Sequence, residues 1–345
     1  MHTFLTPEPI TVEIRNASGD IRVDLADVTT TTVDVVASSG HPFGFIDDVI
    51  RAVASKGQSV GAGRIFGGDR RFDRPSDSYE GGPADDPAER ARVDYREPVT
   101  GKGGTLIVDT DPARDGWKSS FTVHVTAPAS SGIRIQTQSA DVDITGRSDR
   151  LETRTASGDV RIDEVTGKSL VQTASGDVIV NVTAECDIRT ASGDIVVQAV
   201  TSEAVVHSTS GDIRLENLTG NTNARSVSGD IRVLDVTSGR AELTTVSGDV
   251  EVGIHAGSLA AIDLSTISGS TESDFEVSDE VPVGDQPVGG SSVDDSSFGD
   301  SSVSDSFLGD DASAAGPEQA ESPVLDLRVK TTSGNIRLRR SAAVG

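Results

Sequence analysis

Apolar and polar residues alternate over most of the chain, in short runs separated by Ser-Gly-Asp turns. After the turns, the apolar members are Val160 and Ile162, Val178 and Val180, Ile195 and Val197, Ile213 and Leu215, Ile231 and Val233, and Val250 and Val252. Before the turns, a second set comprises Val171 and Thr173, Ile188 and Thr190, Val206 and Ser208, Ala224 and Ser226, Leu243 and Thr245, and Leu264 and Thr266. Period-two alternation is typical of strands with one buried face, so both sets are predicted to point inward.

The turns recur at a nearly constant spacing. Full Ser-Gly-Asp copies end at Asp20, Asp159, Asp177, Asp194, Asp212, Asp230 and Asp249, and degenerate copies end at Asp141, Ser270 and Asn335. From Asp141 to Ser270 the successive spacings are 18, 18, 17, 18, 18, 19 and 21 residues. A further apolar residue marks the opposite corner of each repeat, at Val165, Val182, Val200, Leu218 and Val236. The pattern predicts an all-β fold, a parallel β-solenoid (β-helix) with two strands per coil of about 18 residues, whose handedness the pattern does not determine.

The first and last parts of the chain depart from the repeat. We predict residues 1–104 to be an N-terminal β segment with a loop-rich, partly helical insertion at 38–104, and residues 105–270 to be the solenoid repeats. Strands are expected at Ile10–Ile14, Ile21–Leu25, Thr31–Val36, Thr105–Asp109, Phe121–Ala127 and Ile133–Thr137, and a short helix at Ile46–Ala54. The Gly, Asp and Pro content of the rest of the insertion is typical of loops.

Residues 271–323 are rich in Ser, Asp, Gly and Val and hold fourteen acidic residues with no Lys or Arg. Such a segment has too few apolar side chains to fold alone, so we predict a disordered acidic insertion. The alternation resumes at Leu325, Leu327 and Val329, which places 324–345 as the final coil. Its basic residues Arg337, Arg339 and Arg340 are then expected to cap the rod.

Composition narrows the function classes. The 345-residue chain has a formal net charge of −25 and only 3% aromatic residues, which does not suit a nucleic-acid backbone or an anionic membrane surface. No apolar run is long enough to span a bilayer and no signal peptide is evident, so a cytoplasmic location is expected, with the cell surface not excluded. The single cysteine, Cys186, falls on the inward alternation and is predicted to be a small core residue.

The Ser-Gly-Asp-Ile/Val repeats, with the lead-in Thr122-Val123-His124-Val125-Thr126-Ala127-Pro128, resemble the bacterial putative adhesin family of β-strand-repeat proteins (DUF4097-type). The resemblance covers about 9–36 and 105–345, apart from the acidic insertion. It implies a β-solenoid and an adhesin-like role, and it carries no established catalytic residues to transfer.

The turn Asp residues have two interpretations. A row of carboxylates along one edge of the rod would suit calcium, which prefers clustered oxygens. The Gly-Gly-x-Gly-x-Asp pattern of calcium-binding repeats is absent, however. We therefore expect each Asp to cap its own turn, beside a Gly that allows positive φ, and to be partly offset by nearby Arg.

Arginines recur two residues after the turn Asp, at Arg22, Arg161, Arg214, Arg232 and Arg337, and period two places them outward, as it does Arg189 and Arg225. They could bind an anionic glycan or a protein. The alternative is a solvated ladder of mutually screened charges, in which exposed ion pairs contribute little.

Several motifs resemble catalytic signatures without their context. Gly57-Gln58-Ser59-Val60-Gly61 has the spacing of a nucleophile elbow but lies outside any parallel α/β sheet pattern. Gly61-Ala62-Gly63 has Phe66 where a dinucleotide loop needs its third Gly, and Asp109–Gly116 fails the EF-hand spacing. The histidines His2, His41, His124, His207 and His255 show no ligand spacing.

We therefore expect a non-enzymatic β-solenoid scaffold or binding protein with an unidentified protein or glycan partner and an undetermined oligomeric state. No catalytic, cofactor-binding or metal-ligating residue is predicted. Two alternatives stay open: a carbohydrate-active β-helix enzyme with paired carboxylates, and a cytoskeletal solenoid that assembles end to end through its terminal strands.

Overall fold

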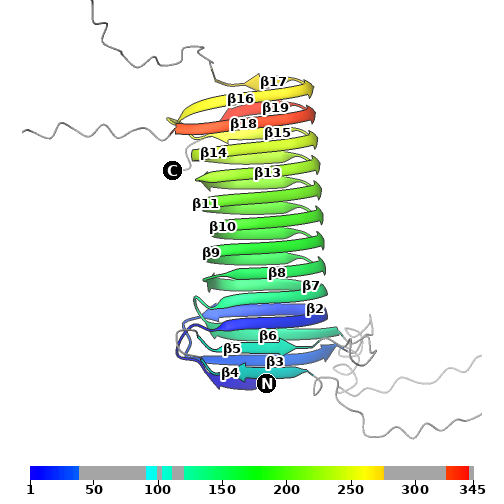
Figure 1. The fold of residues 1–345 in the computed structure, drawn as a ribbon, viewed down its shortest axis with the longest axis vertical. Helices are drawn as coiled ribbons and strands as arrows, with labels where there is room; N and C mark the ends of the chain where they lie inside the picture. The colour runs from blue at the N-terminus through cyan, green and yellow to red at the C-terminus, as the bar shows by residue number, and fades with distance from the viewer. Residues whose placement is uncertain (39–90, 99–102, 111–119, 276–323, 342–345) are drawn as a thin grey trace, which may run out of the picture.

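In the computed structural model, residues 1–38, 91–98, 103–110, 120–275 and 324–341 are described. Every regular element in these ranges is a β-strand, and the strands stack into a rod (Figure 1). No helix in these ranges is long and apolar enough to cross a membrane. The helix predicted at Ile46–Ala54 and most of both predicted insertions lie outside the described residues.

The middle of the rod is a stack of parallel coils. Its strands are β7 (Gly132–Ser148), β8 (Leu151–Ser157), β9 (Val160–Ser175), β10 (Val178–Ser192), β11 (Ile195–Ser210), β12 (Ile213–Thr219), β13 (Asn221–Ser228), β14 (Ile231–Ser247) and β15 (Val250–Ile254). Each residue pairs in parallel with its equivalent one repeat away, so that Val178 lies between Val160 and Ile195. The sequence repeat therefore sets the register of the β-solenoid directly.

The turn glycines adopt the conformation that the sequence predicted. Gly193, for example, has a φ of 133°. A Cβ at this position would overlap the carbonyl oxygen of Gly176 in the adjacent coil. Gly is therefore required at this turn for both its φ angle and its close packing.

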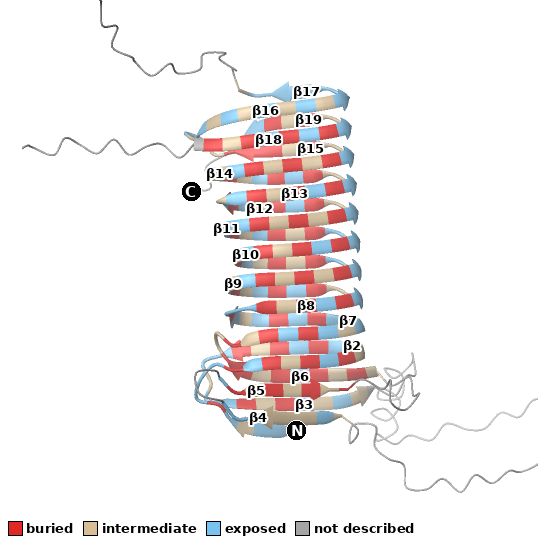
Figure 2. Ribbon diagram, viewed as in Figure 1, coloured by how far each residue is buried: buried red, intermediate tan, exposed pale blue. Residues whose placement is uncertain are grey.

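The alternating apolar residues form one continuous core along the rod, and buried and exposed bands alternate along the strands between its two ends in Figure 2. The inward sets before and after the turns are confirmed, and Cys186 is buried among them. One predicted corner residue is wrong: Val182 is 42% exposed, and Thr183 lies buried in its place, paired with Val165 and Val200. Thr183 is the sixth residue after its turn Asp, as Val165 and Val200 are after theirs, and the residue that this shorter repeat lacks falls after Thr183, where the register shifts.

At the N-terminal end of the rod, strands from two separate parts of the chain pair with one another. Strand β2 (Thr11–Ala26) lies between β7 on one side and β5 (Thr105–Asp109) with β6 (Ser120–Pro128) on the other, all parallel. Strands β3 (Thr30–Ser38) and β4 (Arg92–Arg96) then pair antiparallel with β6 and β5, and β1 (His2–Leu5) pairs antiparallel with β3. The sequence-predicted strands in this region are confirmed, but β4 lies in a stretch that was predicted to be loop.

The C-terminal end corrects the predicted order of coils. Strand β18 (Val324–Ser333) pairs with both β14 and β16 (Leu259–Ser268), and β19 (Ile336–Arg340) pairs with both β15 and β17 (Thr271–Ser273). The last coil in the sequence is therefore the penultimate coil in space, as Figure 1 shows. Arg337, Arg339 and Arg340 consequently lie within the stack and do not cap it.

Side-chain size gives a physical reason for this order. The inward residues of β18, Leu325, Leu327 and Val329, are completely buried between two coils. The inward residues of β16 include Ala260 and Ile262, which are only partly buried at the end of the core. The coil with the larger and more uniform aliphatic side chains occupies the interior position, where burial removes more apolar area from water.

Candidate functional site

The turn carboxylates form a hydrogen-bonded chain along one edge of the rod. Oδ1 of Asp177 accepts the backbone N–H of Asp194 at 2.9 Å, and Oδ1 of Asp194 accepts that of Asp212 at 2.8 Å. The same bond occurs from Asp159 to Asp141, Asp177 to Asp159, Asp230 to Asp212, and Asp249 to Asp230. Each Asp therefore caps the turn of the next coil, whereas the sequence analysis assigned it to its own turn. This bond accounts for the recurrence of Asp without any bound ion.

The chain of bonds ends where the stack ends. Asn335 donates its N–H to Asp249 Oδ1 at 2.7 Å, and its own Oδ1 accepts the N–H of Ser270 at 3.1 Å. Among the described coils, the one with Ser270 has no successor on this side, so its turn needs no acceptor for a further N–H. The change from Asp to Ser at position 270 is thus a sequence signal for the terminal coil, which the sequence analysis did not use.

The arginines of the row that follows the turns form ion pairs with neighbouring carboxylates, which screen their charges. Arg161 contacts Asp159 at 3.2 Å, Arg214 contacts Glu216 at 3.1 Å, and Arg232 Nη2 contacts Asp230 at 2.8 Å. The row is also interrupted, because Ile179 and Val196 occupy the two coils between Arg161 and Arg214. This arrangement favours the interpretation as a solvated charge ladder.

A second row of outward side chains, on the strand segments before the turns, alternates between cations and neutral polar residues. In the order of the coils it reads Arg15, Gln136, Arg154, Gln172, Arg189, His207, Arg225, Thr244, Lys330 and Ser265. We call this set the basic row. It contains no acidic residue, and beyond Arg15 the next pairing partner is Asp109 on β5. Of this row, only Arg189 and Arg225 were predicted from the sequence to point outward; aligning the repeats on their turns would have shown the other members.

The rows on either side of the basic row differ in character. On the side nearest the turn, the side chains are uncharged and include the exposed residues Val227, Val246 and Ile267. On the other side lie carboxylates that pair with the arginines: Glu152 with Arg154 at 2.8 Å, Asp187 with Arg189 at 3.0 Å, and Glu242 with Arg225 at 3.7 Å. The basic row therefore borders an uncharged strip along one flank.

His207 stays neutral within this row under ordinary conditions. Partial burial lowers the pKa of the imidazole, and the adjacent Arg189 and Arg225 lower it further. Its place between two arginines is fixed by the parallel register of β10, β11 and β13. At neutral pH the row thus keeps its alternation of cationic and neutral side chains.

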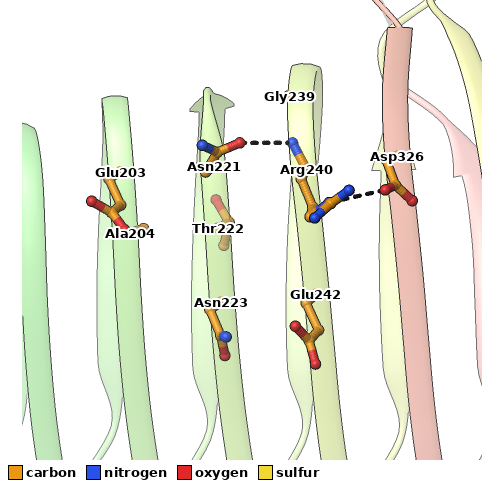
Figure 3. Close-up of a pocket in the computed structure, with 9 residues that line it drawn as sticks. All are labelled: Glu203, Ala204, Asn221, Thr222, Asn223, Gly239, Arg240, Glu242 and Asp326. Atoms are coloured by element: carbon orange, nitrogen blue, oxygen red, sulfur yellow. Dashed lines mark hydrogen bonds and ion pairs between the residues drawn. The ribbon is translucent and has the colours of Figure 1, made fainter.

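An open hollow of about 550 Å³ lies on the same face, where β18 joins β14 (Figure 3). Arg240 spans it, with Nε 2.9 Å from Asp326 and its backbone N–H 3.2 Å from Asn221 Oδ1. Glu203 and Glu242 also line it. The Arg240–Asp326 ion pair connects the interleaved C-terminal coil to the body of the rod.

A second hollow, of about 470 Å³, lies near the N-terminal end and contains a His–Asp pair. His124 Nε2 lies 2.6 Å from Asp24 Oδ2, and Thr145 donates a hydrogen bond to Asp24 Oδ1 at 2.6 Å. These hydrogen bonds lower the pKa of the Asp24 carboxyl. Arg22, Asp34 and Asp143 also line the hollow. The spacing of histidines along the chain did not predict this pair, because Asp24 lies 100 residues away in sequence.

The remaining sequence candidates fall into two groups. Cys186 is buried as predicted, and desolvation raises the pKa of its thiol to about 12, so the thiol stays protonated at neutral pH. The motifs at Gly57–Gly61 and Gly61–Gly63, and all of Asp109–Gly116 beyond Thr110, lie outside the described residues.

Comparison with known proteins gives one family. The sequence model of the Toastrack DUF4097 family matches residues 116–296, just over half of the chain. Among solved structures, the chain is similar to a "putative cell adhesion protein" from Clostridium sporogenes ATCC 15579, with 7% sequence identity, a TM-score of 0.23 and 98% of each chain covered. No curated protein matches the sequence.

Proposed function

We propose that this chain, which belongs to the Toastrack DUF4097 family, is a non-enzymatic, adhesin-like scaffold or binding protein. The observation that carries the proposal is the repeated use of the turn Asp: the same bond between coils recurs from Asp141 to Asn335. These carboxylates hold the rod together, and the outward rows between the turns are left to contact a partner. The cytoplasmic location expected from the sequence stays a prediction.

The proposal includes the shape of each coil. We infer two strands per coil, one after the turn and one before the next turn, although β9 and β10 each run unbroken over 16 and 15 residues. The register shift between Thr183 and Glu185 supports this inference, because it marks the corner opposite the Ser-Gly-Asp turn. Two strands per coil would give the rod two broad faces, and each face would carry its own outward rows.

Partner capture tests the binding role. The full chain is immobilised and compared with a variant that lacks four cations of the basic row, Arg154→Ala, Arg189→Ala, Arg225→Ala and Lys330→Ala. All four are exposed, so the variant is expected to fold. The proposal predicts at least one partner that the wild type retains and the variant loses. An identical set of retained molecules for both proteins would contradict it.

A carbohydrate-active enzyme is the second candidate, and the His124–Asp24 pair favours it. A histidine oriented by a carboxylate is a common general base, and Asp143 supplies a further carboxylate in the same hollow. The candidate predicts turnover of a polysaccharide that Asp24→Asn abolishes. A screen of acidic and neutral polysaccharides without turnover would remove it.

End-to-end assembly is the third candidate, favoured by the open C-terminal coil. Among the described strands, β16 pairs only with β18 and β17 only with β19, and Leu259 and Ile267 on β16 are 62% and 82% exposed. An unpaired edge strand of this kind can pair with another chain. Sedimentation of a monomer at high concentration and moderate salt would exclude this candidate.

A further inference from the structure

We propose that the basic row binds a linear anionic polysaccharide in which acidic sugars alternate with neutral ones. The inference rests on the proposed binding function and names the class of partner. It starts from the alternation itself: cations occupy the first, third, fifth, seventh and ninth coils of the row, at Arg15, Arg154, Arg189, Arg225 and Lys330. Neutral polar side chains occupy the coils between them.

The spacing of the cations selects this class of polymer. Neighbouring coils are about 4.8 Å apart, so the cations recur about every 10 Å along the rod. An extended polypeptide presents side chains on one face about every 7 Å. Each strand of a DNA duplex carries a phosphate about every 3.4 Å. A glycan with one carboxylate per disaccharide carries one charge for every two sugar rings. The length of two sugar rings is close to the distance of about 10 Å between the cations.

The chemistry of the row fits both sugars of such a repeat. An arginine guanidinium presents a planar fork of N–H donors that matches a carboxylate. Gln136, Gln172 and Thr244 offer donors and acceptors for the hydroxyl and amide groups of a neutral sugar. His207, which is neutral because of its lowered pKa, fits the same role. The uncharged strip on the flank of the row leaves room for the carbon faces of the rings.

The existing ion pairs leave the arginines able to bind. The side chains of Arg154, Arg189 and Arg225 are 48%, 54% and 51% exposed. Exposed ion pairs are weak, and each guanidinium has five N–H donors, of which a single carboxylate engages one or two. A glycan carboxylate can therefore bind the free side of each fork, and several weak contacts along one polymer add up through multivalency.

The opposite face lacks this regularity. After the turns, the equivalent outward row includes Asp143, Glu251 and Glu272 between its arginines. Its arginines recur at unequal intervals because Ile179 and Val196 interrupt them. A polymer with one charge per disaccharide would meet repulsive carboxylates on that face. The opposite face therefore provides a matched control.

The test uses the full chain and surface-immobilised hyaluronan, an unsulfated polymer of alternating glucuronic acid and N-acetylglucosamine. The wild type is compared with two variants of equal charge, Arg154→Gln/Arg189→Gln/Arg225→Gln and the control Arg161→Gln/Arg214→Gln/Arg232→Gln. All six positions are exposed, and circular dichroism verifies that both variants fold. Because a lost charge-assisted hydrogen bond is worth about tenfold or more, the first variant should bind at least about tenfold more weakly. The control should bind like the wild type, and high salt should weaken all binding.

Three results would overturn the inference. Equal weakening of both variants would indicate general charge attraction only. Equal or tighter binding to poly-glutamate would indicate an acidic protein as the partner. Absence of wild-type binding to hyaluronan at low salt would reject this polymer class, and the proposed binding function would still stand if partner capture by the wild type depends on the outward arginines.

Discussion

The turn Asp connects neighbouring coils, because its carboxylate accepts a backbone N–H of the next coil. We predict that Asp194→Ala destabilises the protein by about 1–2 kcal/mol, because a hydrogen bond to a charged acceptor is lost near the surface. Asp194→Asn should cost less, since Asn335 makes the same bond in its own coil. Urea unfolding measures both.

Ser270→Ala is the control for this series, because among the described residues no further coil lies beyond Ser270, and its exposed hydroxyl only donates to Asn335 Oδ1, which also accepts the Ser270 N–H. It should change the free energy of unfolding by less than about 0.5 kcal/mol. Equal effects at positions 194 and 270 would mean that the Asp carboxylate contributes no more to stability than the exposed Ser270 hydroxyl.

Cys186 should be inert in the folded protein. Its buried thiol has a pKa raised to about 12, so almost no thiolate is present at pH 8. We predict no reaction with a thiol reagent in native buffer and one equivalent of reaction in denaturant. Rapid labelling of the native protein would contradict the burial of Cys186 in the core.

His207 gives the protein a specific sensitivity to acid. Its folded pKa lies below the ordinary value of 6.5, so the unfolded chain binds the proton more readily. Stability is therefore retained above pH 6.5 and falls as the pH drops through that value towards the folded pKa. His207→Gln should lose less stability than the wild type between about pH 7 and pH 5 in thermal melts. Parallel decreases in the two proteins would show that other groups dominate this range.

At the scale of elements, the main finding is the interleaved coil of β18 and β19. Chain-order stacking would place Ser265 beside Thr244, whereas the observed register places Lys330 between them. Neighbouring coils are about 4.8 Å apart, within reach of a disulfide, and alternate coils are about twice as far apart. We predict that Thr244→Cys with Lys330→Cys forms a disulfide under mild oxidation, while Thr244→Cys with Ser265→Cys does not. The opposite result would place the C-terminal coil last.

Most strands, but not their spatial order, could be predicted from the sequence. Alternation and turn glycines are local signals, so the strands around Val160 and Ile231 followed directly from the repeat. Val182 was the wrong choice because it is the fifth residue after its turn Asp, whereas Thr183, like Val165 and Val200, is the sixth, so alignment of the repeats on their turns would have identified Thr183. The place of β18 depends on contacts made across 86 residues, as in the Arg240–Asp326 pair. Only the presence of Ser270 in place of the turn Asp indicated locally that the coil of β16 and β17 is the terminal one.

At the scale of the whole molecule, the rod differs between its ends and between its faces. The N-terminal end carries antiparallel strands, whereas the C-terminal end leaves the edge of β16 unpaired among the described residues. The arrangement of outward side chains on the faces of the rod could be predicted only in part. The outward direction of Arg189 and Arg225 followed from period two, but the His124–Asp24 pair and the place of Lys330 between Thr244 and Ser265 require the register between coils.

The measurement that tests the central claim most directly follows one acidic polysaccharide sample for both binding and chain length in the presence of the full-length protein. Hyaluronan of defined length is mixed with the wild type, binding is measured by calorimetry, and the polymer is then sized by chromatography. The account predicts saturable, salt-sensitive binding with the polymer length unchanged. Shortening of the polymer that Asp24→Asn abolishes would contradict it and identify the His124–Asp24 hollow as an active site.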